Sequence, residues 1–157
     1  MVRDSPYVGP RPFERGDRHR FYGREREARE LRALIVAERE VLFYAQSGAG
    51  KTSLLNAMVI PALEEKGFHV LPMTRVGSDL PPGTDSASVN NVFVFSTLMG
   101  LAGEDTSPQT LLDHTLHSFL ETFYPAPEPG NEFEGQPLVL IFDQFEELST
   151  AHQGGKQ

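Results

Sequence analysis

The residues whose types and spacing could do chemistry lie in the run AQSGAGKTS, from Ala45 to Ser53. Its two glycines let the backbone wrap a polyphosphate with N–H groups pointing inward, and the positive end of a helix would lie behind them. Lys51 supplies a charge for the β- and γ-phosphates and is a candidate catalytic residue, while the Thr52 hydroxyl can ligate Mg²⁺. This is the pattern of a phosphate-binding P-loop, or Walker A motif. The expected nucleotide contacts are Gln46, Ser47, Gly48, Ala49, Gly50, Lys51, Thr52 and Ser53.

The loop departs from the usual pattern at one position, because Ala45 stands where the first glycine is expected. An alanine is tolerated there if its φ stays negative. The loop follows the apolar run VLFY, which predicts a buried strand over Val41–Tyr44. A helix is expected from Lys51, with Pro61 kinking it or ending its first part and Glu64 to Gly67 closing it. Its apolar side consists of Leu54, Leu55, Met58 and Val59.

A second candidate site follows the apolar run Leu138–Phe142, LVLIF. A continuous apolar run is typical of a strand in a parallel sheet that helices cover on both faces. Asp143 would then emerge at the carboxyl end of this strand, a Walker B position, on the same sheet edge as the P-loop. Mg²⁺ keeps much of its hydration shell, so Asp143 would hold it mostly through water. Glu146 or Glu147 could polarise the attacking water; alternatively, both only complement the dipole of a helix.

The first part of the chain is rich in arginine, proline and aromatic residues. Residues 1–20 hold three prolines and two glycines, which predicts an extended segment and no helix. The spacing of apolar residues after Gly23 predicts an amphipathic helix over 24–38, with Glu25 and Arg29 placed for an i,i+4 pair. The aromatic-glycine junction before it, Phe21-Tyr22-Gly23, is a plausible platform for a purine.

Four blocks together resemble the novel STAND-type NTPases, a branch of the signal-transducing ATPases within the AAA+-like P-loop group. They are YVGPRPF, FYGREREARELRALI, YAQSGAGKTSLLNAMVIPAL and LVLIFDQFEEL. The resemblance implies an α/β fold, a three-layer P-loop NTPase with a parallel sheet. It implies that residues 1–20 lead into the NTPase domain of 21–157, and that the adenine is covered by Phe21, Tyr22, Gly23 and Arg24.

The family resemblance also bears on the C-terminal part of the chain. In such ATPases the strand with the γ-phosphate sensor comes after the Asp strand, whereas this sequence ends 14 residues after Asp143. We therefore expect an incomplete sheet, in a fragment or truncated product of a longer switch protein, without all the machinery needed to act. Self-association, or contact with C-terminal sensor or effector segments, is the expected partnership.

The middle of the chain carries one more predicted strand and two predicted helices. A strand is expected over Phe68–Thr74, and Arg75 at its end is read as a surface arginine in preference to a nucleotide contact. The run from Asn91 to Gly103 suits either a strand or a helix; the resemblance implies a helix, capped by Asn90 or Asn91. Another helix follows Ser107-Pro108, with Leu112, Leu116, Phe119, Leu120 and Phe123 on one face. Its histidines, His114 and His117, could ligate a metal, but positions facing solvent or the core edge are favoured.

Composition limits the remaining possibilities. The 157 residues suit one globular domain with a net charge of -8, and the absence of cysteine excludes disulfides and thiolate sites. Ten of the eleven arginines lie at or before Arg39, so a nucleic-acid surface is disfavoured beyond that point. The sequence begins with no secretory signal and holds no run of membrane-spanning length, which makes a cytoplasmic protein the default.

The leading functional hypothesis is the ATP-binding core of a signalling switch that binds Mg²⁺–ATP and hydrolyses it slowly. ATP is preferred because neither Asn-Lys-x-Asp nor an Asp-x-x-Gly after a strand is present to indicate GTP. The switching role rests on the resemblance. Two alternatives stay open: a conventional P-loop ATPase or kinase, and a nucleotide-binding scaffold without hydrolysis.

Overall fold

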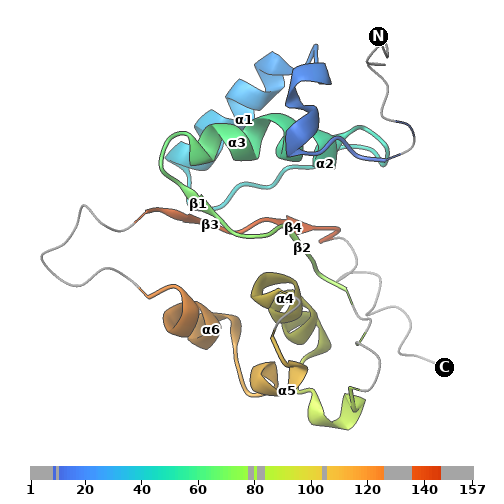
Figure 1. Ribbon diagram of the computed structural model, residues 1–157, viewed down its shortest axis with the longest axis vertical. Coiled ribbons are helices and arrows are strands. Elements are labelled where there is room, and N and C mark those ends of the chain that lie inside the picture. Colours follow the sequence, from blue (N-terminus) through green and yellow to red (C-terminus); the bar gives the residue numbers. More distant parts are fainter. Residues whose placement is uncertain are drawn as a thin grey trace, which may run out of the picture. The chain divides into compact units, whose positions relative to one another are not determined.

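The chain folds into a mixture of helices and short strands, seen in a computed structural model (Figure 1). The structure describes residues 9, 11–77, 80, 84–103, 106–125 and 136–145. It divides into two compact units, residues 1–70 and 71–157, which are described in turn.

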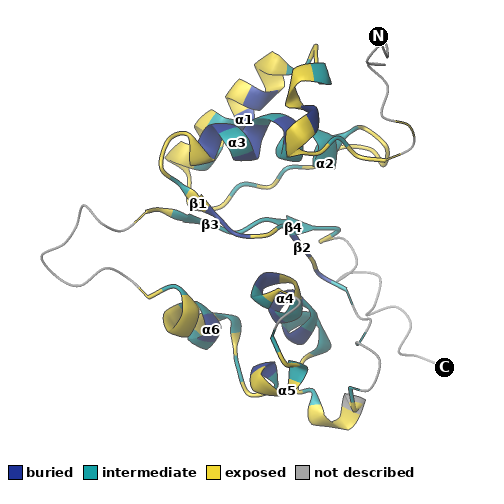
Figure 2. Cartoon of the chain, in the orientation of Figure 1, coloured by how far each residue is buried: buried dark blue, intermediate teal, exposed yellow. Residues whose placement is uncertain are grey.

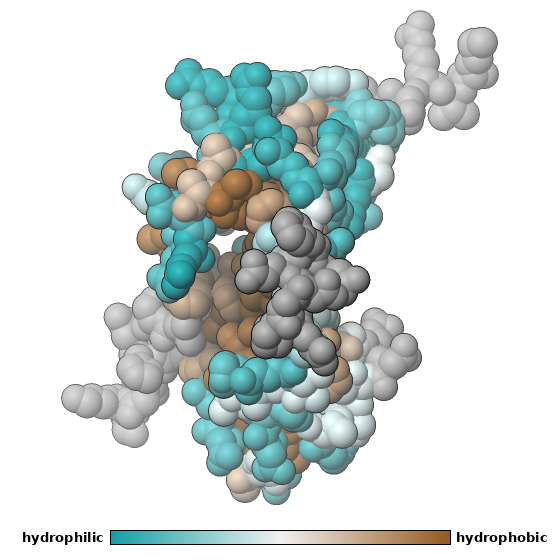
Figure 3. Space-filling view, turned by 90° about the vertical axis from the view of Figure 1, so that its left-hand side faces the viewer, coloured by the Kyte–Doolittle hydropathy of each residue, from teal (hydrophilic) through white to brown (hydrophobic). Residues whose placement is uncertain are grey.

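The first unit is mainly helical. Its elements are η1 (Arg15–Arg20), α1 (Glu25–Ala37), α2 (Lys51–Leu54), η2 (Leu55–Val59), α3 (Ile60–Glu64) and the short strand β1 (His69–Val70). Its buried side chains come mostly from α1 and from the helical segment 51–64, and include Leu31, Leu54, Val59 and Leu63 (Figure 2). The surface of this unit is largely hydrophilic on the face shown in Figure 3, in keeping with its arginines and glutamates.

The prediction that residues 1–20 contain no helix is wrong, because η1 is a 3-10 helix within them. Asp17 explains the turn: its carboxylate accepts from the Glu14 N–H at 3.0 Å, and its backbone N–H donates to the Glu14 carbonyl. Arg11 adds two hydrogen bonds to the same carboxylate, at 2.7 and 3.3 Å. A local side-chain network therefore stabilises a turn that the prolines and glycines alone do not predict.

Helix α1 confirms the amphipathic pattern, with Ala28 and Leu31 buried. Its ion pairs differ from the expected one: Arg26 Nε lies 2.8 Å from Glu30 Oε1, and Glu25 accepts from the Gly23 N–H at 3.1 Å. The Glu25 carboxylate is therefore bonded to the backbone just before the helix and does not make the predicted pair with Arg29.

Pro61 does not end the helical segment after the loop, and the predicted kink stays a prediction. The helical segment continues from Lys51 to Glu64, and its middle, η2, is a turn of π-helix. Proline has no N–H and its ring crowds the carbonyl four residues before it. A π turn immediately before Pro61 changes the hydrogen-bond register, which allows the segment to continue. Helix α3 then ends at Glu64, as predicted.

The predicted strand over Val41–Tyr44 is not formed. The backbone of 41–46 belongs to neither a helix nor a strand, and the side chains of Leu42 and Tyr44 are 80% and 83% exposed. An apolar run becomes a strand only where a neighbouring strand can accept its backbone hydrogen bonds. Within the described part of the first unit, β1 is the single strand, and it is two residues long.

The second unit combines strands and helices. Its elements are β2 (Thr74–Arg75), η3 (Ser86–Ser88), α4 (Val92–Ala102), α5 (Pro108–Leu111), α6 (Leu116–Phe123), β3 (Leu138–Val139) and β4 (Phe142–Asp143). Strands β2 and β4 run parallel, with Thr74 opposite Phe142 and Arg75 opposite Asp143. Hydrogen bonds extend this register from Leu71 N to the Val139 carbonyl and from Val76 N to the Asp143 carbonyl. The α/β class and the parallel pairing are thus observed; the three-layer arrangement stays a prediction.

The ambiguous run 92–102 is a helix, as predicted. Asn91 caps it, with Oδ1 accepting from the N–H groups of Phe93 and Val94 at 3.0 and 3.2 Å. Gly103, at φ 78°, follows the last turn, a conformation that glycine adopts readily.

The single helix expected after Pro108 is wrong, because the structure has two short helices, α5 and α6. Thr115 breaks the run: its Oγ1 accepts from the Ser118 N–H at 3.0 Å, and Ser118 Oγ accepts from the Thr115 N–H at 2.9 Å. This reciprocal capping box starts a new helix at Leu116.

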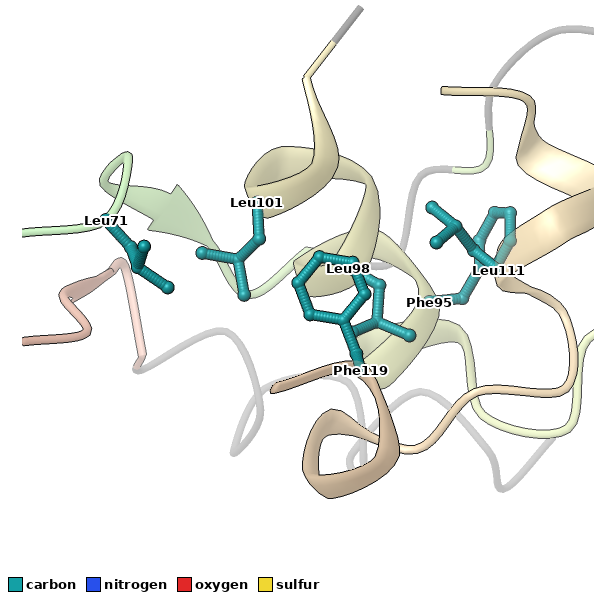
Figure 4. Packing of buried hydrophobic residues seen from close by; sticks show 6 residues of the cluster. All are labelled: Leu71, Phe95, Leu98, Leu101, Leu111 and Phe119. Atoms are coloured by element: carbon teal, nitrogen blue, oxygen red, sulfur yellow. The ribbon is translucent and has the colours of Figure 1, made fainter. Parts of the chain in front are cut away.

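The core of the second unit lies between α4, α5 and α6, as Figure 4 shows. Its fully enclosed members are Leu71, Phe95, Leu98, Leu101, Leu111 and Phe119. The run Leu138–Phe142, expected to be buried on both faces, is only half-buried.

Candidate functional site

The backbone of the glycine-rich loop adopts the conformation that its sequence requires. Gly48 and Gly50 have φ of 78° and 75°, values that other residues rarely adopt, and the Ala49 N–H donates to the Gln46 carbonyl at 3.1 Å. Gly50 then precedes α2, and its carbonyl accepts from the Leu54 N–H. Residues in the left-handed region directly before a helix help to turn backbone N–H groups toward one side, an arrangement suited to anions.

Lys51 is folded back over its own loop. Its Nζ donates to the Ala45 carbonyl at 3.0 Å. In a trans peptide the carbonyl and the following N–H point in opposite directions, so this contact directs the Gln46 N–H away from the lysine. Ala45 is compatible with the loop because its φ is not positive. Among the described residues, the non-glycine residue with a positive φ is Gln144.

Arg24 is the residue from outside the loop that contacts its apex. Its Nη1 donates to the Ala49 carbonyl at 3.0 Å, and its Nε donates to Glu27 Oε1 at 2.7 Å. The pKa of Glu27 is lowered, first by a hydrogen bond from its own backbone N–H and also by Arg24. The resemblance assigned Arg24 to the adenine, and nothing in the spacing predicts a contact with a loop 25 residues away.

The aromatic junction before α1 is well defined. The rings of Phe13 and Phe21 meet edge to face with centroids 5.0 Å apart, and the Tyr22 hydroxyl donates to the His19 carbonyl. Tyr22 is largely exposed, and Gly23 has a φ of 83°. The role of these residues as a platform for a purine stays a prediction.

The N-terminal arm, which we define as residues 11–20, is attached to the helical segment after the loop. The Phe13 N–H donates to Ser53 Oγ at 3.1 Å. At the other end of the segment, Arg15 forms two bonds with Glu64, at 2.8 and 3.0 Å, and Arg18 lies 2.6 Å from Glu65. Sequence reasoning missed this use of Ser53, which it assigned only to nucleotide.

The remaining predicted site residues belong to the second unit. Asp143 ends β4, where its Oδ1 accepts from the Gln144 N–H at 3.0 Å, and Gln144 turns the chain with a φ of 57°. Arg75 lies opposite Asp143 in the strand pair and is exposed. Glu146 and Glu147 lie outside the described residues. The loop with Arg24 and the strand with Asp143 are therefore defined separately, each within its own unit.

The two histidines of the middle region have ordinary structural contacts. His114 Nδ1 lies 3.2 Å from Ser118 Oγ, and its ring meets Phe119 edge to face at the margin of the core. His117 is exposed, with Nε2 3.3 Å from Glu121 Oε1. These are the core-edge and solvent-facing positions that were favoured for them.

No helix in the described segments combines the length and apolar character needed to cross a membrane. No curated protein and no solved structure matches the chain. The family model described as Novel STAND NTPase 1 matches residues 6–157, which include the arm, the glycine-rich loop and the strand that ends in Asp143. The chain therefore belongs to the novel STAND NTPase family, whose members are NTPases of the signal-transducing class.

Proposed function

We propose that this chain is the Mg²⁺–ATP-binding part of a signalling switch that hydrolyses ATP slowly. The observation that carries the proposal is the conformation of the loop. Two glycines adopt left-handed φ values at the positions that the phosphate-binding pattern requires, directly before a helix that begins with Lys51 and Thr52. Family membership supports the class of reaction.

The donor set fits a nucleotide with its metal ion. Loop N–H groups and the Lys51 ammonium suit phosphate oxygens, and the Thr52 hydroxyl and Asp143 carboxylate are the hard oxygen ligands that Mg²⁺ prefers. When bound, Mg²⁺ would neutralise charge that develops on the phosphates. In this proposal Lys51 leaves the Ala45 carbonyl for the phosphates, and Tyr22 and Gly23 cover the base.

Hydrolysis requires a group that accepts a proton from water. Glu146 and Glu147 follow Asp143 closely, and we propose that one of them is this base. The switching part of the proposal rests on different affinities of two conformations for ATP and ADP, since a ligand shifts an equilibrium only by its differential binding. A three-layer arrangement with a parallel sheet, a cytoplasmic location and self-association belong to the same proposal.

Binding is tested by calorimetric titration of the chain with Mg²⁺–ATP. Lys51→Ala is expected to weaken binding by about 2 kcal/mol, or about thirtyfold, the size of a charge-assisted hydrogen bond. Lys66→Ala is the matched control, because Lys66 is exposed just beyond the same helical segment. Equal binding by the wild type and Lys51→Ala would contradict the assignment of the loop.

Hydrolysis and switching have their own tests. Glu146→Gln and Glu147→Gln are compared by phosphate release, and the base is the residue whose loss slows release while ATP binding is retained. Unchanged release in both variants excludes both as the base. For switching, light scattering of the protein should give different masses with ATP and ADP; equal masses would exclude switching by assembly.

A further inference from the structure

Arg24 differs from the other arginines near α1 in what its guanidinium contacts. One nitrogen, Nη1, donates to the Ala49 carbonyl in the glycine-rich loop, while Nε donates to Glu27 on the first turn of α1. Two residues further along, Arg26 forms a similar bond with Glu30, but on an exposed face of the helix. Both arginines therefore pair with a glutamate, and Arg24 also bonds to the loop.

The contact determines how one peptide of the loop is oriented. The Ala49–Gly50 peptide is trans, so its carbonyl and the Gly50 N–H point in opposite directions. When Arg24 holds the carbonyl, the Gly50 N–H points away from Arg24. Gly50 has a φ of 75°, and a Cβ at this position would lie 3.8 Å from Arg24 Nη1. The guanidinium of Arg24 is therefore next to the backbone of the loop.

We propose that Arg24 is a positioning residue of the phosphate loop: braced by Glu27, its guanidinium holds the Ala49 carbonyl so that the Gly50 N–H is presented to phosphate. This inference rests on the proposed function. It gives Arg24 a role distinct from covering the adenine, because the ligand group that depends on it is the polyphosphate.

The planar guanidinium is required because it directs two donors along fixed axes, one to Glu27 and one to the loop. A lysine could carry the charge to only one of these acceptors in the same geometry. Arg24→Lys should therefore behave much like Arg24→Ala.

The test compares ATP with inorganic tripolyphosphate, which has no base, by calorimetric titration of wild type and variants in the presence of Mg²⁺. Arg24→Ala should weaken the binding of both ligands by the same factor, about tenfold, near the lower end of the loss associated with one charge-assisted hydrogen bond. If ATP binding falls and tripolyphosphate binding is unchanged, Arg24 contacts the base and the proposal is overturned.

The variant Glu27→Ala distinguishes a role in positioning Arg24 from a purely electrostatic effect of the carboxylate on anion binding. Removing a carboxylate beside an anion site strengthens anion binding if only charge matters. If Glu27 braces Arg24, the same change weakens tripolyphosphate binding several-fold and adds little to Arg24→Ala in the double variant. Glu30→Ala and Arg26→Ala are matched controls on the same helix and should stay within about twofold of wild type. Tighter binding by Glu27→Ala would overturn the proposal.

A measurement without ligand separates this inference from the proposed function. The backbone amide resonances of Gly48 and Gly50 should shift in Arg24→Ala and Glu27→Ala and stay in place in Arg26→Ala. Resonances that do not move show that the loop is not held by Arg24, even if ATP binds. A wild type that binds neither ATP nor tripolyphosphate would instead overturn the proposed function, and with it the ligand-binding role of Arg24.

Discussion

The Phe13 N–H donates to Ser53 Oγ at 3.1 Å, so a residue of the N-terminal arm is hydrogen-bonded to the helix that directly follows the glycine-rich loop. A hydroxyl oxygen can accept one bond while its hydrogen is donated elsewhere. Ser53 can therefore keep its bond to the arm and still donate to a phosphate. The position of the arm and the occupancy of the loop then involve the same side chain.

Ser53→Ala should loosen the arm. Loss of one neutral hydrogen bond costs about 1 kcal/mol, which corresponds to an increase of about fivefold in the population of molecules whose arm is detached from the helix. Limited trypsin digestion without nucleotide measures this population, because Arg15, Arg18 and Arg20 of the arm each precede a residue other than proline. Cleavage within the arm should be faster in this variant than in Ser107→Ala, whose hydroxyl contacts Gln109 in the second unit. Equal cleavage rates would show that the bond to Ser53 does not hold the arm.

The carboxyl group of Asp17 should make the arm sensitive to acid. Hydrogen bonding from Arg11 lowers the pKa of Asp17, with help from the Glu14 N–H. Because the folded-state pKa is below the unfolded value of about 3.9, this stabilisation is present above pH 4 and is lost as pH falls through the folded-state pKa. Denaturant unfolding measured from about pH 6 down to about pH 2.5 should show a smaller acid dependence in Asp17→Asn. An unchanged pH profile would contradict the role of this carboxylate.

Gly100 should resist replacement by alanine, although alanine is favoured in helices by about 1 kcal/mol. A Cβ at Gly100 would overlap Thr74 Oγ1 and lie 3.0 Å from Thr74 Cβ, so helix α4 could not keep its distance from β2. Overpacking of this kind costs about 1–3 kcal/mol, which outweighs the helix preference. Thermal unfolding should therefore show a lower Tm for Gly100→Ala and partial recovery when Thr74→Ala is added.

Gly16→Ala is the control for this prediction, because a Cβ at Gly16 meets no atom within 4 Å and its φ is not in the left-handed region. Its Tm should stay close to that of the wild type. A Gly100→Ala variant as stable as Gly16→Ala would show that α4 and β2 do not approach closely.

Two phenylalanines of α6 provide a matched pair for the core. Phe119 is 1% exposed within the core cluster, whereas Phe123, one turn later, is 50% exposed. Phe119→Ala should reduce the free energy of unfolding by about 3–5 kcal/mol, and Phe123→Ala by well under half of that. Chemical denaturation measures both values, and similar losses would contradict the assignment of the core.

The parts of the fold that the sequence predicted are those set by local rules. Helix α1 follows from the spacing of its apolar residues, and the loop from glycines that must adopt positive φ. The run of α4 suited either a strand or a helix, and the helix was expected from the family resemblance. The parts it did not predict depend on distant partners or on short-range competition. The described residues provide no strand partner for Val41–Tyr44, and the Thr115–Ser118 capping box interrupts a helix that the apolar spacing alone would continue.

The candidate site shows the same division. The residues that would contact phosphate were found from their spacing, because the pattern is contiguous. The contacts of Arg24 with Ala49 and of Phe13 with Ser53 join segments 25 and 40 residues apart, and a single sequence carries no sign of them.

The exposed side chains of Leu42 and Tyr44 have a practical consequence for work with purified material. They belong to an extended apolar segment whose described backbone lies outside any strand, and such segments are templates for aggregation. Without nucleotide, light scattering should therefore detect larger species as the protein concentration rises. Leu42→Lys, which places a charge on this exposed apolar segment, should suppress this aggregation and improve solubility.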